Sequence, residues 1–438
     1  MKTALDDILI IASQPKAAEK LQSFVAHHSM SGFLRSRGQI AQQVRDIVDE
    51  VARRGDDAVI ALTERFDNTR LTPETLRIDP ADLAAAHRGI DGTLMASLRR
   101  AIENVRAYQS AIFIGRNTIP GIRYMPLKRV GLCIPGASAP LPSTVIMTAV
   151  PAIVAGVKEI VVVSPPRHNG TIHPVILAVC HELGIREVYR IGGAQAVAAL
   201  AWGTRTIPKV DKIVGPGNDY VQLAKKEVFG LVDMDSFAGP SDVLIIADDS
   251  ANPAWVAADI LSQAEHNPGA GILVTNSQEL AQNVLSQLVE QVARLNRAEA
   301  ALECLKAYSA IIVFDELQQA IDFANDFASE HMQIQCGDRS RAVLERIQNA
   351  GAIFVGPWTP VAVGDYWAGP SHTLPTRQTT RHFSALTSND FVKSSSIIEY
   401  DKDKLLAAAD DIIRLATTEG LGAHAASVDI RRRQDPHT

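Results

Sequence analysis

The chain has 438 residues, of which 46% are hydrophobic and 21% are charged, and its formal net charge is -6. On the usual size of about 150 residues per domain, this length predicts two or three globular domains with a large buried core. The acidic balance and the scattered Lys and Arg residues argue against nucleic acid as a partner.

The N-terminus and the cysteines indicate a cytoplasmic protein. Residues 1–7 are acidic and lack the apolar core of a signal peptide. Apolar runs such as 160–163 have the length of a strand, far below the roughly 20 residues that cross a bilayer, so we expect no membrane segment. No CxxC spacing occurs among the four cysteines, which argues against a disulfide framework or a thiolate zinc site: Cys133, Cys180, Cys304 and Cys336.

The first part of the chain has the apolar spacing of amphipathic helices. Ile40, Val44, Ile47 and Val51 recur at three- and four-residue steps, and a similar pattern runs from Leu94 to Val105. We therefore expect residues 1–129 to form a helical segment, and we expect it to pack on the second of two α/β units further along the chain.

From residue 130 short apolar runs alternate with helical patterns. The predicted strands and helices of residues 130–238 follow in order: strand 130–136 with its turn, helix 143–156, strand 159–164, helix 174–183, strand 187–191, helix 194–202, strand 212–215 and helix 220–229. Such alternation over short connections predicts a parallel sheet covered on both faces.

A second round of the same alternation fills residues 239–378. Its predicted elements are strand 243–247, helix 253–263, strand 271–275, helix 278–295, strand 311–314, helix 317–327 and strand 352–356. The tail, residues 379–438, adds a helix at 402–417, a loop at 419–424 and a basic end at 431–433. The predicted fold class is therefore α/β, with two doubly wound Rossmann-like units, an N-terminal helical segment and a C-terminal tail.

Three loops of the first unit are rich in glycine and follow predicted strands. They are 135–140, 192–195 and 215–218. Ligands of open parallel sheets bind beyond the carboxyl ends of the strands, and glycine lets backbone N–H groups approach a phosphate. No G-x-G-x-x-G pattern is present, so the loops fit either a nucleotide site or plain tight turns.

Candidate chemistry-bearing residues lie in the second unit and the tail. Gln263 and His266 stand three residues apart near a predicted helix end. On one helical face both side chains could bind the same metal ion, and the alternative is that both are ordinary polar caps. Further along the chain, His residues accompany carboxylates at Glu330-His331, at Asp365 with His372, and at Glu419 with His424. Adjacent Glu330 and His331 point different ways on a strand or a helix, so the pair fits two separate acid–base tasks better than one relay, with a buried His beside a surface Glu as the alternative.

These motifs together resemble the histidinol dehydrogenase family over residues 30–432. The resemblance rests on nine stretches: 136–144 (GASAPLPST), 192–196 (GGAQA), 207–220 (IPKVDKIVGPGNDY), 238–243 (AGPSDV), 262–268 (SQAEHNP), 329–332 (SEHM), Gly364-Asp365, 369–376 (GPSHTLPT) and 419–424 (EGLGAH). It implies an NAD- and Zn²⁺-dependent enzyme that oxidises the small molecule L-histidinol twice, through the aldehyde, to L-histidine.

The resemblance also implies a role for each matching residue. The zinc ligands would be Gln263, His266, Asp365 and His424. His331 would be the general base for the alcohol, and Glu330 would activate water. Cys133, Gln195 and Asn218 would contact NAD. The residues that would contact the substrate are Ser241, Gln263, His266, His331, Asp365, His372, Glu419 and His424. In this family the enzyme is a homodimer with shared active sites, so the C-terminal tail with Glu419 and His424 would serve the partner subunit.

Five positions depart from the family pattern and keep alternatives open. Cys133 replaces a usual Tyr, Asp242 a Glu, Asn267 an Asp, Ser371 an Asn and Gly422 a Glu. A first alternative is a paralogue that oxidises another small amino alcohol or a hydroxysulfonate, although the stretch 140–144 favours the histidinol branch. A second alternative is a metal-dependent hydrolase that uses Glu330 and needs no nucleotide.

Overall fold

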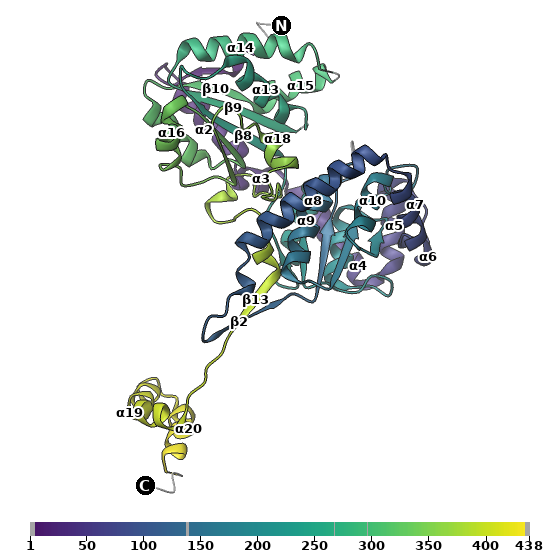
Figure 1. Ribbon diagram of the computed structural model, residues 1–438, viewed down its shortest axis with the longest axis vertical. Helices are drawn as coiled ribbons and strands as arrows, with labels where there is room; N and C mark the ends of the chain where they lie inside the picture. Colours follow the sequence, from purple (N-terminus) through teal and green to yellow (C-terminus); the bar gives the residue numbers. More distant parts are fainter. Residues whose placement is uncertain (1–4, 137–139, 267, 296, 434–438) are drawn as a thin grey trace. The chain divides into compact units, whose positions relative to one another are not determined.

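The computed structural model describes residues 5–136, 140–266, 268–295 and 297–433, and these divide into two compact units (Figure 1). The larger unit comprises residues 1–115 and 126–392, and the smaller comprises residues 116–125 and 393–438. In the part of the chain that the structure describes, every helix is too short or too polar to span a bilayer.

The larger unit contains two parallel sheets, as predicted. The first has the strand order β5-β4-β3-β6-β7, in which the order reverses between β3 and β6. Central residues pair as Leu132 with Val162 on one side and with Val214 on the other. This is the Rossmann-like arrangement, with strands at Arg129–Cys133 (β3), Glu159–Val163 (β4), Glu187–Tyr189 (β5), Lys212–Val214 (β6) and Asp233–Met234 (β7).

Helices cover both faces of this first sheet. Pro142–Ala155 (α9) and Pro174–Glu182 (α10) share one apolar core, and Gly193–Trp202 (α11) and Asp219–Val228 (α12) share the other. Side chains of alternating strand residues, such as Leu132 and Cys133, enter opposite cores, which is the pattern of a strand buried on both faces.

The second sheet has the strand order β1-β10-β9-β8-β11-β12, and all its pairings are parallel. Its strands are Leu9–Ile11 (β1), Ser241–Ala247 (β8), Gly269–Thr275 (β9), Ala310–Val313 (β10), His331–Gln335 (β11) and Ala352–Val355 (β12). One face is covered by Pro253–Ala264 (α13), Gln278–Val292 (α14) and Ala298–Tyr308 (α15). The other is covered by Ala17–His28 (α2), Leu317–Phe327 (α16) and Ser340–Leu344 (α17), and Val361–Tyr366 (α18) follows β12.

The N-terminal helices correct one expectation. We expected residues 1–129 to pack on the second α/β unit, but of its helices and strands it is residues 5–28, with β1 and α2, that enter the cores of the second sheet. Helices α4 (Gly38–Arg54) and α5 (Asp56–Asp67) pack against α11 and α12 of the first sheet, because apolar residues such as Val44 and Val51 fill the groove above the alanine-rich α11. Helices α7 (Pro80–Gly89) and α8 (Gly92–Ile112) pack on α10 and α9, and the short α3 (Met30–Ser36) and α6 (Pro73–Leu76) complete the segment.

The smaller unit holds a helical hairpin. Lys402–Thr418 (α19) and Gly422–Arg433 (α20) pack on each other, so the predicted loop 419–424 ends at Gly422 and His424 lies in α20. Strand β2 (Ile122–Pro126) pairs with β13 (Val392–Ser396). Leu415, Leu421 and Ile430 of the hairpin remain exposed, which leaves it with an uncovered apolar surface.

Candidate active site

The candidate site is built first from the end of α13. Asn252 caps the helix and Pro253 begins it, and Gln263 is buried near its last turn. The Ser241 hydroxyl donates a hydrogen bond of 2.8 Å to Oε1 of Gln263. Gly269 is required here because a Cβ at this position would lie 2.0 Å from the Gln263 carbonyl oxygen. The start of β9 therefore lies directly against Gln263.

The three-residue spacing predicts that His266 and Gln263 can share a helix face, but in the structure they do not. Helix α13 ends at Ala264, and the His266 N–H donates to the Gln263 carbonyl in a tight turn. His266 is exposed, and it lies close enough to Asp365 and His372 to contribute to the lowered pKa of each, so the three groups are neighbours in space.

Glu330 and His331 form the buried centre of the site. His331 is the first residue of β11, and its Nδ1 lies 3.0 Å from the Asp242 carbonyl oxygen and 3.5 Å from Glu330 Oε2. The imidazole is therefore oriented by the backbone of β8 more closely than by Glu330. Its Nε2 is buried, has no hydrogen-bond partner among the described residues, and lies 3.8 Å from Asp365 Oδ1.

Asp242 holds Glu330 in place, a role that sequence reasoning missed. The Glu330 N–H donates to Asp242 Oδ1 at 2.8 Å, and the Asp242 N–H donates to Glu330 Oε2 at 3.0 Å. Both carboxyl groups are buried. The only sequence signal for this contact was that position 242 carries an acidic residue, Asp, where the family usually has Glu.

Asp365 and His372 close the site. His372 Nδ1 lies 3.1 Å from the Asp365 carbonyl oxygen, and its Nε2 lies 3.4 Å from the Thr144 hydroxyl of α9. Thr144 belongs to the first sheet's helix layer, so His372 connects the two α/β units. Ser371, one of the departures from the family pattern, donates to the Met147 carbonyl at 2.9 Å and accepts from the Thr373 N–H.

The electrostatics of the site favour a basic imidazole. Burial opposes a charge on His331, but Glu330 and Asp365 outweigh it and raise the pKa of the imidazole above its usual range. Burial raises the pKa of Glu330. Burial also opposes ionisation of Asp365, yet His331 reverses this and lowers the pKa of that carboxyl. His372 behaves as a buried histidine should, because burial lowers its pKa.

The site lies at the amino ends of the strands of the second sheet. Ser241, Gly269 and His331 are the first residues of β8, β9 and β11. The general expectation for open parallel sheets, a ligand beyond the carboxyl ends, does not hold for this half of the molecule.

The residues of the larger unit offer part of a metal site. Gln263, His266 and Asp365 present an amide oxygen, an imidazole and a carboxylate, which are hard and borderline donors of the kind that zinc accepts. Across the described ranges, no group of three or more His, Cys, Asp or Glu side chains is arranged to hold a metal ion. The donor chemistry fits zinc, and the buried Nε2 of His331 lies close to Asp365.

A cavity of about 320 Å³ lies at the carboxyl ends of the first sheet's strands. It is lined by residues of all three glycine-rich loops, including Gly136, Gly193 and Gly217, so these loops meet at one edge of the sheet. Cys133, Gln195 and Asn218 all line it, and Asn218 also caps α12 by accepting from the Val221 N–H. The cavity sits where the strand order reverses, between β3 and β6.

The structure thus brings together seven of the predicted site residues: Ser241, Gln263, His266, Glu330, His331, Asp365 and His372. Glu419 and His424 belong to the smaller unit, where both are exposed, and their roles stay predictions. Asn267 and part of the stretch 136–144 fall outside the described residues.

Fold and site together define an α/β enzyme with two Rossmann-like units, one bearing a glycine-lined cavity and the other a buried acid–base pair. Comparison with known families gives a match to the model described as histidinol dehydrogenase over residues 34–432. The chain therefore belongs to the histidinol dehydrogenase family.

Individual relatives agree. The chain is 48% identical over 395 residues to histidinol dehydrogenase from Rhodopirellula baltica, with 89% of this chain and 86% of the relative covered. It is 48% identical over 398 residues to histidinol dehydrogenase from a Synechococcus species, covering 89% and 92%. A crystal structure of histidinol dehydrogenase from Elizabethkingia anophelis superposes with a TM-score of 0.88 at 33% identity, covering 97% of this chain and 98% of the other.

Proposed function

We propose that this protein oxidises L-histidinol to L-histidine in two successive steps that consume two NAD and require zinc. The observation that carries the proposal is the buried Nε2 of His331, which faces Asp365 beside Gln263 and His266 in a chain of this family. A general base needs a nitrogen that can take up the substrate's proton, and no hydrogen bond within the described residues occupies this one.

The cofactors would occupy separate places. Zinc would be held by Gln263, His266 and Asp365 of one subunit and by His424 of the other, and NAD would occupy the cavity lined by Cys133, Gln195 and Asn218. When bound, zinc would polarise the substrate's oxygen and the nicotinamide would accept hydride.

The chain's own residues then divide the proton chemistry. In the first step His331 removes the hydroxyl proton of the alcohol while the carbon loses hydride, which gives the aldehyde. In the second, Glu330 removes a proton from a water molecule that adds to the aldehyde carbon, and a further hydride leaves to the cofactor. The resulting carboxylic acid loses its remaining proton to solvent and becomes the carboxylate. Neighbouring carboxylates strengthen His331 as a base, and burial brings the pKa of Glu330 up toward the range of a general base.

We also propose a homodimer with shared sites. The helical hairpin of the smaller unit carries Glu419 and His424, both exposed, together with exposed apolar residues such as Leu415 and Ile430. Mixing two inactive variants, His331→Asn and His424→Asn, tests this. A shared site restores about a quarter of wild-type activity after subunit exchange, because half of the dimers are mixed and each has one intact site. No restoration in a mixture shown to contain mixed dimers would contradict it.

The domain division proposed with this function places the NAD side in residues 130–238 and the metal and base in residues 239–378, with residues 379–438 serving the partner. A reduced cytoplasmic location fits the four buried cysteine side chains.

The decisive assay measures NADH formation by the purified protein with L-histidinol. The proposal expects NADH that disappears on treatment with a chelator and returns when zinc is added. Full turnover by protein stripped of all metal would refute the zinc requirement, and hydrolysis without hydride transfer would favour a hydrolase. A panel with other amino alcohols and hydroxysulfonates addresses the paralogue alternative, which the departures at Cys133, Ser371 and Gly422 motivate.

A further inference from the structure

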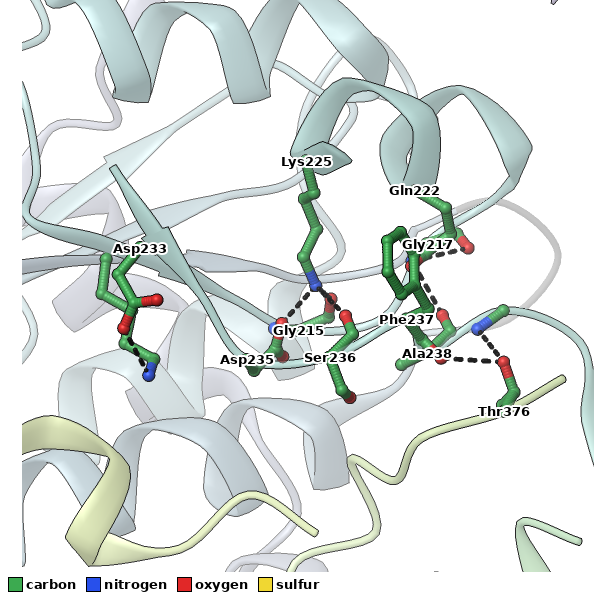
Figure 2. Close-up of polar contacts among 12 residues, drawn as sticks. Gly215, Gly217, Gln222, Lys225, Asp233, Asp235, Ser236, Phe237, Ala238 and Thr376 are labelled. Carbon is green, nitrogen blue, oxygen red and sulfur yellow. Dashed lines mark hydrogen bonds and ion pairs between the residues drawn. The ribbon is translucent and has the colours of Figure 1, made fainter. Parts of the chain in front are cut away.

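Residues 235–241 connect the first sheet to the second. They begin after β7 and end at Ser241, the first residue of β8 and the partner of Gln263. None of them lines the cavity of the first sheet, yet their backbone is hydrogen-bonded to the loop 215–217 that leads into that cavity's wall (Figure 2).

Lys225 of α12 is the first link between the loop and this segment. Its side chain is fully buried, and its ammonium group donates to the carbonyls of Gly215 at 3.1 Å and Ser236 at 2.9 Å and to Oδ1 of Asp235. The other oxygen of Asp235 accepts from the Gly215 N–H at 2.7 Å. An ammonium has three donors, so Lys225 is fully used and both groups are paired.

Gln222, one turn earlier on α12, is the second link. Its amide nitrogen donates to the Gly217 carbonyl at 3.3 Å and to the Ala238 carbonyl at 2.9 Å. The Gly217 N–H also donates to the Ala238 carbonyl, at 3.2 Å. Gly217 lines the cavity and must be glycine, because a Cβ there would lie 2.5 Å from the Val221 side chain.

Thr376 holds the same segment from the side of the second sheet. Its hydroxyl donates to the Phe237 carbonyl at 2.8 Å and accepts from the Gly239 N–H at 3.0 Å. Two residues beyond Gly239, Ser241 contacts Gln263. Hydrogen bonds therefore connect the cavity wall to residues 237–239, and the backbone continues from Gly239 to Ser241, which is bonded to the candidate metal ligand Gln263.

We propose that Lys225 and Gln222 are positioning residues that couple occupancy of the first sheet's cavity to the placement of Ser241. This inference rests on the proposed function, since it takes NAD as the occupant of the cavity. A ligand that orders loop 215–218 also orders residues 237–241 through Gln222, and by reciprocity the placement of Ser241 affects affinity for the cofactor.

The chain supplies a matched control for the buried pair. Lys212 and Asp233 form an ion pair of 2.9 Å between the amino ends of β6 and β7, and the Lys212 side chain is also buried. Neither residue lines the cavity. Lys212→Met thus removes a buried lysine from the same sheet without touching loop 215–218 or residues 235–241.

Hydrogen exchange of the full-length zinc-loaded protein, with NADH as the probe, tests the coupling. In the wild type NADH slows exchange in residues 215–218 and in residues 237–241. In Gln222→Met it slows exchange in the first segment alone, and NADH affinity falls about tenfold, the loss expected for a pair of hydrogen bonds. Lys212→Met behaves as the wild type.

Two further variants guard against a simple folding defect. Thr376→Val keeps the shape of the side chain and removes the hydroxyl bonds to Phe237 and Gly239, without changing the cavity wall. NADH should therefore no longer slow exchange in residues 237–241 of this variant. Lys225→Met combined with Asp235→Asn removes both charges together, avoids leaving one buried charge unpaired and gives the same uncoupling. In turnover, uncoupling raises KM for NAD and for the alcohol together.

The outcomes separate this inference from the proposed function. A wild type that binds NADH without slower hydrogen exchange in residues 237–241 overturns the coupling and leaves the proposed function standing. A Gln222→Met protein in which NADH still slows exchange in residues 237–241 has the same consequence. Equal loss of the response in Lys212→Met also overturns it, because the effect then reflects general stability. A wild type that fails to bind NADH removes both.

Discussion

Asp259 provides a quantitative test of the electrostatics beneath the candidate site. It lies on α13 one turn before Gln263, and only 8% of the residue is exposed. Burial raises the pKa of its carboxyl from 3.8 to about 6, and a hydrogen bond from Gln333 offsets part of that rise. We predict that Asp259→Asn stabilises the protein at neutral pH.

The size and sign of the effect follow from linkage. The rise in the pKa of Asp259, by about two, corresponds to about 3 kcal/mol. The ionised carboxyl subtracts this amount from the free energy of unfolding, and relaxation around the charge reduces it to about 1–3 kcal/mol. Because the folded pKa is the higher one, the wild type loses this stability as the pH rises from about 4 to about 6. Asparagine carries no charge, and its amide could donate to Gln333 Oε1, a buried atom without a partner among the described residues.

Urea unfolding followed by tryptophan fluorescence, with chelator present, measures the difference. Trp255 stands four residues before Asp259 on α13 and reports on this helix. The Asn variant should be more stable at pH 7 and above, and the difference should vanish below about pH 4. Asp315→Asn, at an exposed position, is the control and should change nothing. A destabilised Asp259→Asn protein at pH 7, or a benefit that grows on acidification, would refute the reasoning.

The remaining predictions concern the protein's chemistry and surface charges. His331→Asn should slow alcohol oxidation greatly and keep zinc, whereas His266→Asn should lose zinc; unchanged metal content in the second variant would show that the ligand assignment is wrong. Glu182→Gln should lower the free energy of unfolding at pH 7 by about 1 kcal/mol, because Glu182 accepts from the half-exposed Arg99 at 2.8 Å. The pKa of Glu182 is lowered to about 2, so this contribution should be lost as the pH falls from about 4.5 toward 2 in acid titration. None of the four buried cysteines should react with a thiol reagent at pH 8 before unfolding, since burial raises the pKa of Cys133 to about 12, and rapid labelling of the native protein would contradict this.

Buried strands with continuous apolar runs were predictable from the sequence almost to the residue. Residues 243–247 and 311–313 are continuously apolar and β-branched or aliphatic, so the sequence predicts a buried strand at each. Strand β11 was missed because it alternates apolar and glutamine residues and opens with His331, although all five of its residues are buried. Strand β1 was missed because three residues at a sheet edge leave no periodic signal.

The packing of the N-terminal helices could not be read from the sequence. Periodicity at Val44 and Val51 shows that one helix face is buried, but it carries no information about which partner buries it. The partner turned out to be α11, whose small residues permit close approach, and this is a property of two distant segments together.

The candidate site was predictable as a set of residues and not as a geometry. Motifs identified Gln263, Glu330, His331 and Asp365, and the structure places them together. The position of the site at the amino ends of the strands depends on topology, and the bonds from Asp242 to Glu330 depend on the register of β8 with β11. Neither leaves a local signature in the sequence.

The most direct test of the proposed chemistry is the stoichiometry of NADH to L-histidinol at completion with the purified, zinc-loaded protein. Two successive oxidations at one site predict two NADH for each histidinol consumed, with L-histidine as the product. One NADH for each histidinol, with the aldehyde released to solution, would contradict the assignment of Glu330 to the second step, and an absence of NADH would contradict the proposed function itself.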